Sequence, residues 1–294
     1  MPQTATKPVG FADYLELTKP RLSLLSVLTA LAGYLAARPP FILGELLAVV
    51  AGTSLAAGGV AALNQWLEHE TDARMKRTAD RPIPMGRVPT GSAFVLGALM
   101  CVVALGVIFA KANGIAALFT LLTIVAYLGW YTPAKRRSRW STEIGAVAGA
   151  LPPLIGWTAG EGGVTTLGVI LFGILFFWQL PHFLAISWIY RRDYAAVRFP
   201  ILPVRDEAGG RVAAWAFVST VLLVCVSLAP VFLRLLTPMY GAVAAAAGGW
   251  MLWRAAAFLR TGSRDASARS LFLASLAYLP LTLGTLVADR IAHY

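Results

Sequence analysis

Three oxygen-bearing side chains recur at four-residue intervals in the stretch 64–82: Asn64, Glu68 and Asp72. On an α-helix each step of four residues rises about 6 Å and turns about 40° around the axis. The three side chains are therefore expected to lie on one face, near the end of an apolar helix. Their oxygens could share a hard cation there, because Mg²⁺ prefers oxygen ligands.

Basic residues follow directly in the next helical turns and the adjoining loop: Arg74, Lys76, Arg77, Arg81 and Arg87. Carboxylates beside basic side chains are what a magnesium diphosphate requires. Mg²⁺ takes a few protein oxygens plus phosphate oxygens, while Arg and Lys bind the remaining charge. The alternative is a solvated face of ion pairs at a membrane edge. Polar side chains that enter a membrane segment mark function by default, which favours the diphosphate site.

A compact cationic cluster occurs later in the chain, in the segment YTPAKRRSRW (131–140), at Lys135, Arg136, Arg137 and Arg139. The cluster suits an anion. The alternative is the ordinary enrichment of basic residues in cytoplasmic loops of membrane proteins.

A second polar intrusion interrupts an apolar run at Gln179 and His182, about two to three helical turns before Asp193. A lone histidine on an apolar helix is more often a hydrogen-bonded core residue than a ligand. Here Pro181 frees a backbone carbonyl beside it, and the same helix leads to an acidic residue at the membrane edge. Both interpretations of His182 therefore stay open.

The composition identifies the kind of molecule that must position these residues. Of 294 residues, 58% are hydrophobic and only 13% are charged, and the mean hydropathy is +0.69. These values exclude an ordinary soluble domain and predict an all-α, polytopic membrane protein. Cys101 and Cys225 lie inside apolar runs and are interpreted as small hydrophobic residues.

Apolar runs long enough to cross a bilayer cover most of the chain. The fifth of them contains Pro152 and Pro153, which should break or widen its helix. The last three are interpreted as scaffold. We expect nine spans, at 22–37, 42–66, 92–111, 114–131, 143–160, 165–189, 211–234, 238–257 and 269–288.

The basic residues predict the orientation of these spans. If the N-terminal segment 1–21 is cytoplasmic, only four of the 25 basic residues fall on the other side: Arg38, Lys111, Arg234 and Arg290. This asymmetry predicts a cytoplasmic N-terminus and cytoplasmic loops carrying the polar motifs. The net charge of +11 reflects this topology and attraction to anionic lipid or substrate. Nucleic acid is not implied.

Six segments together resemble a known family, the intramembrane aromatic prenyltransferases (UbiA-type), and within it the branch that modifies haem. The resemblance covers nearly the whole chain. It is carried by LTKPR (17–21), the Asn-x-x-x-Glu-x-x-x-Asp run (64–72) with MKRT and RP behind it, YTPAKR (131–136), GALPPLIGW (149–157), WQLPHF (178–183) and DYAAVRFPILPV (193–204).

The resemblance implies a bundle of about nine helices around a central cavity, forming a single membrane-embedded domain over residues 1–294. It implies transfer of a farnesyl group from farnesyl diphosphate to a vinyl group of protohaem IX, with water addition, to give haem O. Mg²⁺ is the implied cofactor, and haem is a substrate. The cell inner membrane is the implied location, and haem A synthase or oxidase assembly proteins are the implied protein partners.

Site residues follow by motif position. Asn64 and Asp72 are the implied magnesium and diphosphate ligands, and Glu68 stands where aspartate is usual. His182 could orient haem, coordinate its iron or handle a proton, and Asp193 is what remains of a second acidic motif. The expected diphosphate contacts are Lys76, Arg77, Arg81, Lys135 and Arg136.

Two other functions remain as alternatives. One is a prenyltransferase of the same superfamily that acts on a quinone precursor or chlorophyllide, against which the PHF and PPLIGW segments argue. The other is a transporter of an anionic solute. A transporter is expected to carry its polar groups near the bilayer midplane, whereas the polar groups of this chain gather at one leaflet.

Overall fold

A computed structural model describes residues 10–37, 40–260 and 262–293, so residues 1–9 of the expected N-terminal segment and Arg38 lie outside it. Every regular element in these ranges is a helix. The elements are α1 (Phe11–Leu17), α2 (Pro20–Ala37), α3 (Leu43–Asp72), α4 (Thr90–Lys111), α5 (Gly114–Val125), the π-helix η1 (Ala126–Tyr131), α6 (Thr132–Arg137), α7 (Ser141–Ala150), α8 (Pro152–Glu161), α9 (Thr166–Ile189), α10 (Arg191–Ala196), α11 (Leu202–Arg205), α12 (Gly210–Phe232), α13 (Pro238–Leu259) and α14 (Arg264–His293).

The predicted all-α membrane fold is confirmed. Within the described ranges, eight helical runs are long and apolar enough to cross a bilayer, and one of them is the continuous run α5–η1–α6 (Gly114–Arg137). Helix α3 has 30 residues and is therefore about 45 Å long. This exceeds the roughly 30 Å of bilayer hydrocarbon, so the polar end of α3 can reach the membrane edge.

The fifth expected span, 143–160, is two helices. Helices α7 and α8 have 10 residues each and meet at Leu151. Pro152 and Pro153 begin α8, where their missing N–H groups and fixed φ angles suit the first helical turn but cannot continue α7. Each half is about 15 Å long. The nine expected crossings are thus eight full-length runs and this broken pair.

Helices α2 and α8 approach until their backbones touch. A Cβ atom at Gly156 would lie 1.7 Å from the carbonyl oxygen of Ala30, and one at Gly33 would lie 2.1 Å from that of Pro153. Only glycine fits at such a contact, which is how helices pack closely in membranes. The glycine of PPLIGW therefore serves the packing of α8 against α2.

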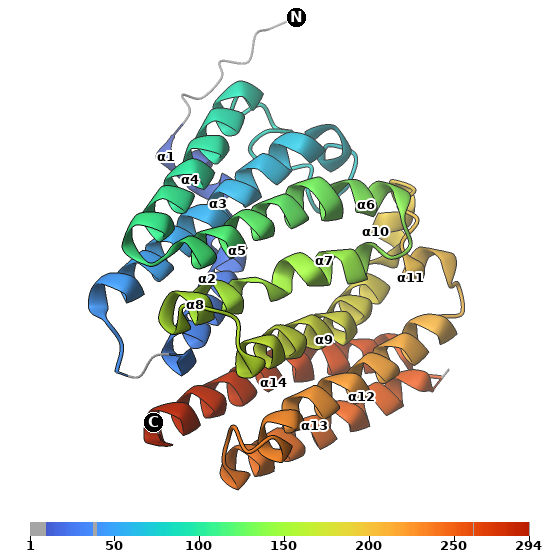
Figure 1. Cartoon of the computed structure of the whole chain (residues 1–294). Helices are drawn as coiled ribbons and strands as arrows, with labels where there is room; N and C mark the ends of the chain where they lie inside the picture. Colours follow the sequence, from blue (N-terminus) through green and yellow to red (C-terminus); the bar gives the residue numbers. More distant parts are fainter. Residues whose placement is uncertain (1–9, 38–39, 261, 294) are drawn as a thin grey trace, which may run out of the picture.

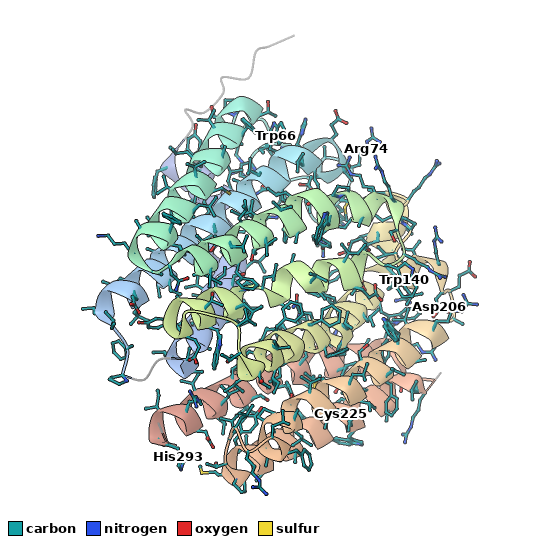
Figure 2. All side chains as sticks on the ribbon, viewed as in Figure 1. Trp66, Arg74, Trp140, Asp206, Cys225 and His293 are labelled. Carbon is teal, nitrogen blue, oxygen red and sulfur yellow. The ribbon has the colours of Figure 1, made fainter. Side chains whose placement is uncertain are left out.

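The connecting segments that carry the polar motifs gather at one end of the bundle. Figure 1 shows α6, α10 and α11 at this end, and the C-terminal end of α14 at the opposite end. In Figure 2, Arg74, Trp140 and Asp206 lie toward the first end, whereas His293 lies toward the other. The basic connections thus share one end of the bundle, and the side of the membrane that this end faces stays a prediction.

Candidate active site

The polar end of α3 is buried. Asn64, Glu68 and Asp72 are only 3–4% exposed. The Nδ2 group of Asn64 donates a hydrogen bond of 2.9 Å to Oε2 of Glu68, one helical turn away. Buried polar groups are costly unless they are paired, so the surroundings of each oxygen decide what this face can bind.

A basic side chain neutralises each carboxylate. Nζ of Lys135 lies 2.7 Å from Oε2 of Glu68, and Nη1 of Arg81 lies 2.5 Å from Oδ2 of Asp72. Buried ion pairs offset the desolvation cost of their charges only when further hydrogen bonds support them. The structure thus forms two ion pairs on this face, Glu68 with Lys135 and Asp72 with Arg81. Asn64 joins the first pair through its hydrogen bond to Glu68.

One carboxylate oxygen is left over. Oε1 of Glu68 is buried and has no hydrogen-bond partner, which costs about 1–3 kcal/mol for an unsatisfied group and more when it is charged. No group of three His, Cys, Asp or Glu side chains in the described residues could hold a metal ion alone. Two carboxylates and an amide oxygen nevertheless fit Mg²⁺, which fills its other positions with phosphate oxygens and water.

The π-helix η1 places the residues that face Asn64 and Glu68. It runs directly into α6, where Oγ1 of Thr132 donates to Oδ1 of Asn64 at 3.0 Å. Nζ of Lys135 lies 4.9 Å from the ring centroid of Tyr131. An extra residue in one turn rotates all later side chains by about 100° relative to an uninterrupted α-helix. The π-turn therefore sets the register of Thr132 and Lys135.

The rim of the site joins α3 to the end of α9. Nη2 of Arg77 donates to the hydroxyl of Tyr194 at 3.2 Å, and its guanidinium lies 5.2 Å from the Tyr190 ring centroid. Burial lowers the pKa of Arg77, but the nearby Tyr194 and Asp193 raise it more, with a net rise. Asp193 thus lies beside Arg77, and no contact among the described residues joins it to Asp72.

Lys19 is a further candidate for this site, and it was not among the site residues predicted from the sequence. It lies in the turn between α1 and α2 with a positive φ of 45°, a conformation that is strained for a residue with a side chain. Nε2 of Gln65 fixes this turn by donating to the carbonyl of Leu17 at 2.7 Å. Burial and the charges of Arg81 and Lys135 lower the pKa of Lys19 to about 7. The available signal was the motif LTKPR, which contains Lys19.

Two of the expected diphosphate contacts lie outside the buried cluster. Nη2 of Arg136 donates to the carbonyl of Leu67 at 3.2 Å and stays at the exposed side of α3. Lys76 is exposed and makes no side-chain hydrogen bond or ion pair with the described residues. Of the basic residues named from the sequence, Arg81 and Lys135 reach the carboxylates, and Arg77 lies at the rim.

His182 lies apart from this cluster, between α9 and α14. Nδ1 of His182 is 2.8 Å from Oγ of Ser275, and the ring stacks on Trp178 with centroids 4.9 Å apart. A third aromatic ring, that of Phe272, lies 4.9 Å away. Interpreting the last three spans as scaffold was therefore incomplete, because Ser275 of α14 holds a candidate site residue.

The face of α9 that carries His182 leads to the α3 site. His182, Ile186 and Tyr190 follow at four-residue steps, and Tyr190 is the residue that lies against Arg77. Eight residues of helix measure about 12 Å. His182 thus lies about two helical turns before Tyr190, which contacts Arg77 at the rim of the site.

Proteins of known sequence share most of this chain. A protoheme IX farnesyltransferase from Opitutus terrae is 65% identical over 291 residues, which are 99% of this chain and 99% of that protein. A protoheme IX farnesyltransferase from Solibacter usitatus is 39% identical over 290 residues, covering 95% of this chain and 98% of that protein.

Solved structures share the fold. A digeranylgeranylglyceryl phosphate synthase superposes with a TM-score of 0.82 at 17% identity, over 96% of this chain and 98% of that one. A UbiA homologue from Archaeoglobus fulgidus, solved bound to GPP and Mg²⁺, gives a TM-score of 0.66 at 13% identity, over 94% of this chain and 99% of that one.

The family assignment rests on a match over most of the chain. The sequence profile of the UbiA prenyltransferase family matches residues 26–276, which include α3, the π-helix, the broken pair α7–α8 and α9. The buried oxygens with their basic partners lie inside this range. The chain belongs to the UbiA prenyltransferase family.

Proposed function

We propose that this chain transfers the farnesyl group of farnesyl diphosphate to a vinyl group of protohaem IX, and that addition of water gives haem O. The activity is that of the relatives that share 65% and 39% of its residues. The observation within the chain that carries the proposal is the buried cluster at the end of α3, where Glu68 keeps an unpartnered oxygen.

The cluster suits a magnesium diphosphate in its charges. The carboxylates of Glu68 and Asp72 pair with Lys135 and Arg81, and both carboxylates act electrostatically on Lys19. When bound, Mg²⁺ would be held by Asn64, Glu68 and Asp72 and would neutralise charge on the diphosphate. Lys135 and Arg81 would then turn from the carboxylates to the phosphate oxygens, for which Lys and Arg are the usual partners.

The reaction requires the allylic carbon–oxygen bond of farnesyl diphosphate to break. Its electron pair leaves with the diphosphate, and the basic side chains that touch the phosphates stabilise the developing charge. The allylic cation needs electron-rich walls that keep water out. Tyr127 and Tyr131, whose rings pack edge-to-face 5.1 Å apart, lie on the π-helix beside Lys135. A vinyl carbon of haem then forms the new carbon–carbon bond, and water captures the resulting cation and releases a proton.

His182 marks the acceptor end. Its ring lies among Trp178, Phe183 and Phe272, which offer flat apolar surfaces to a porphyrin. A haem held there lies within about two helical turns of the rim formed by Tyr190 and Arg77. The whole chain acts as one membrane-embedded unit, with the donor site on the cytoplasmic side of the inner membrane.

The product tests this function. Purified protein in lipid, given protohaem, Mg²⁺ and isotope-labelled farnesyl diphosphate, is expected to yield a haem that has gained one farnesyl group and one water by mass spectrometry. Recovery of all the label as farnesol, with haem unchanged, would show that the proposal is wrong.

The acceptor site has its own test. His182→Ala is expected to weaken haem binding or transfer much more than farnesyl diphosphate binding. If His182 only supports packing, the variant will lose thermal stability, and the surviving folded protein will bind haem as the wild type does.

A further inference from the structure

Ser275 fastens α14 to α9 at two points. Its carbonyl oxygen accepts a hydrogen bond of 2.7 Å from Nε1 of Trp178, and its Oγ lies 2.8 Å from Nδ1 of His182. Ser275 is fully buried, and Trp178 is 2% exposed. The first bond uses the backbone and the second uses the side chain, so the two can be separated by substitution.

The direction of the second bond follows from counting protons. The hydroxyl of Ser275 donates to the carbonyl of Phe272 at 2.6 Å. A hydroxyl group has a single proton to donate. The carbonyl of Phe272 can only accept, so both bonds are made at once only when Oγ of Ser275 accepts from His182, with the proton of a neutral imidazole on Nδ1. Nε2 then carries the lone pair.

The Nε2 atom remains available. Nε2 makes no hydrogen bond within the described part of the chain. It is also not among the side-chain atoms that are both fully buried and unpartnered, so it keeps some accessible surface. The side of α9 that carries His182 leads to Tyr190 at the rim of the donor site. A histidine with Nδ1–H bonded to an oxygen and Nε2 open is the usual arrangement of an imidazole metal ligand.

We propose that Ser275 is a positioning residue, which fixes the tautomer and the ring orientation of His182 so that Nε2 ligates the iron of the haem acceptor. This inference rests on the proposed function and names the group that holds its substrate. Ser275 does not touch haem itself; it acts through His182.

A matched pair of variants isolates the hydroxyl. Ser275→Thr and Ser275→Val add the same volume and keep the backbone bond to Trp178, but only threonine keeps an acceptor oxygen. Ser275→Ala removes the hydroxyl without added volume. Ser219→Ala is the control, because Ser219 is equally buried and bonds only to a carbonyl of its own helix.

The readout is titration of each purified variant with haem, followed by the Soret band, with farnesyl diphosphate affinity measured in parallel. Wild type, Ser219→Ala and Ser275→Thr should share one histidine-ligated spectrum. Ser275→Ala and Ser275→Val should bind haem about 10- to 100-fold more weakly, with an altered spectrum, as is typical when the partner of a metal-ligating histidine is lost. Farnesyl diphosphate affinity should not change.

Two failures can be told apart. If the wild type farnesylates haem and the Thr and Val variants give the same haem affinity and spectrum, the role of Ser275 is refuted and the function stands. If Ser275→Val shows the weakened spectrum but the wild type yields no farnesylated haem, the positioning of His182 stands and the proposed reaction is wrong.

Discussion

The two oxygens of Glu68 have different surroundings, and this difference is the basis for interpreting the α3 cluster as a metal site. Oε2 accepts from Asn64 and from Lys135, whereas Oε1 is buried with no partner. An ion-pair face would satisfy both oxygens. A metal-binding carboxylate is expected to have one oxygen held by hydrogen bonds, which fix its position, and one oxygen free to bind the cation.

Asp72→Asn tests the metal at the residue scale. The change removes a ligand charge, so turnover should fall by at least about two orders of magnitude, the scale of losing a key electrostatic contact. The folded protein should remain. Asp80→Asn, which changes an exposed carboxylate in the same loop, should keep normal turnover. Near-normal turnover of Asp72→Asn, or activity that survives thorough chelation of Mg²⁺, would contradict the assignment.

Lys19 gives a second prediction at this scale. A bound diphosphate would restore the charge of a lysine whose pKa is lowered by burial and by its basic neighbours. Lys19→Met should therefore raise the dissociation constant of farnesyl diphosphate by about tenfold or more, the loss of one charged hydrogen bond. Lys111→Met, at the far end of α4, is the control. Equal affinities of the two variants, measured by isothermal titration, would remove Lys19 from the site.

At the scale of elements, the close contact between α2 and α8 holds the broken span in place. Gly156→Ala would drive a Cβ atom into the backbone of α2, and overpacking of this kind costs typically 1–3 kcal/mol. The melting temperature in detergent should fall clearly. Gly284→Ala, where a Cβ meets no atom within 4 Å, should leave it unchanged or higher. A Gly156→Ala protein that melts with the wild type would show that α2 and α8 are not in backbone contact.

Helix limits could be predicted from the sequence because apolar length and proline position determine them. The span expected at 165–189 is α9, Thr166–Ile189, and the break expected at Pro152 is where α8 begins. The oxygens of α3 were found because carboxylates are rare and costly in a membrane helix. These features depend on composition within one segment.

The remaining parts of the site depend on contacts between segments. The segment AYLGWY carries no sign of a π-turn, which needs the neighbouring helices to favour it. Ser275 could not be distinguished from other serines, because a serine in a membrane helix usually bonds to its own helix, as Ser275 also does to Phe272. Lys19 enters the site only through a turn with positive φ.

At the scale of the molecule, the connections that carry the basic motifs lie at one end of the bundle, where Figure 1 shows α6, α10 and α11. Reporter fusions at Met85, Lys135 and Ser263 should all give a cytoplasmic signal, because Met85 and Ser263 lie in connections at the basic side and Lys135 lies near the end of α6 at the same side. The C-terminal end of α14 should be on the other side. An outside signal at any of the three positions would be inconsistent with this arrangement of the spans.

The choice of acceptor tests the account most directly, because it involves both the α3 cluster and His182. Purified wild-type protein is incubated with isotope-labelled farnesyl diphosphate, Mg²⁺, protohaem and 4-hydroxybenzoate in one reaction. The products are then separated and identified by mass spectrometry. The account predicts that the label appears on haem, as a farnesyl group with one added water, and that His182→Ala loses this product. Label on 4-hydroxybenzoate, with haem unchanged, would contradict it.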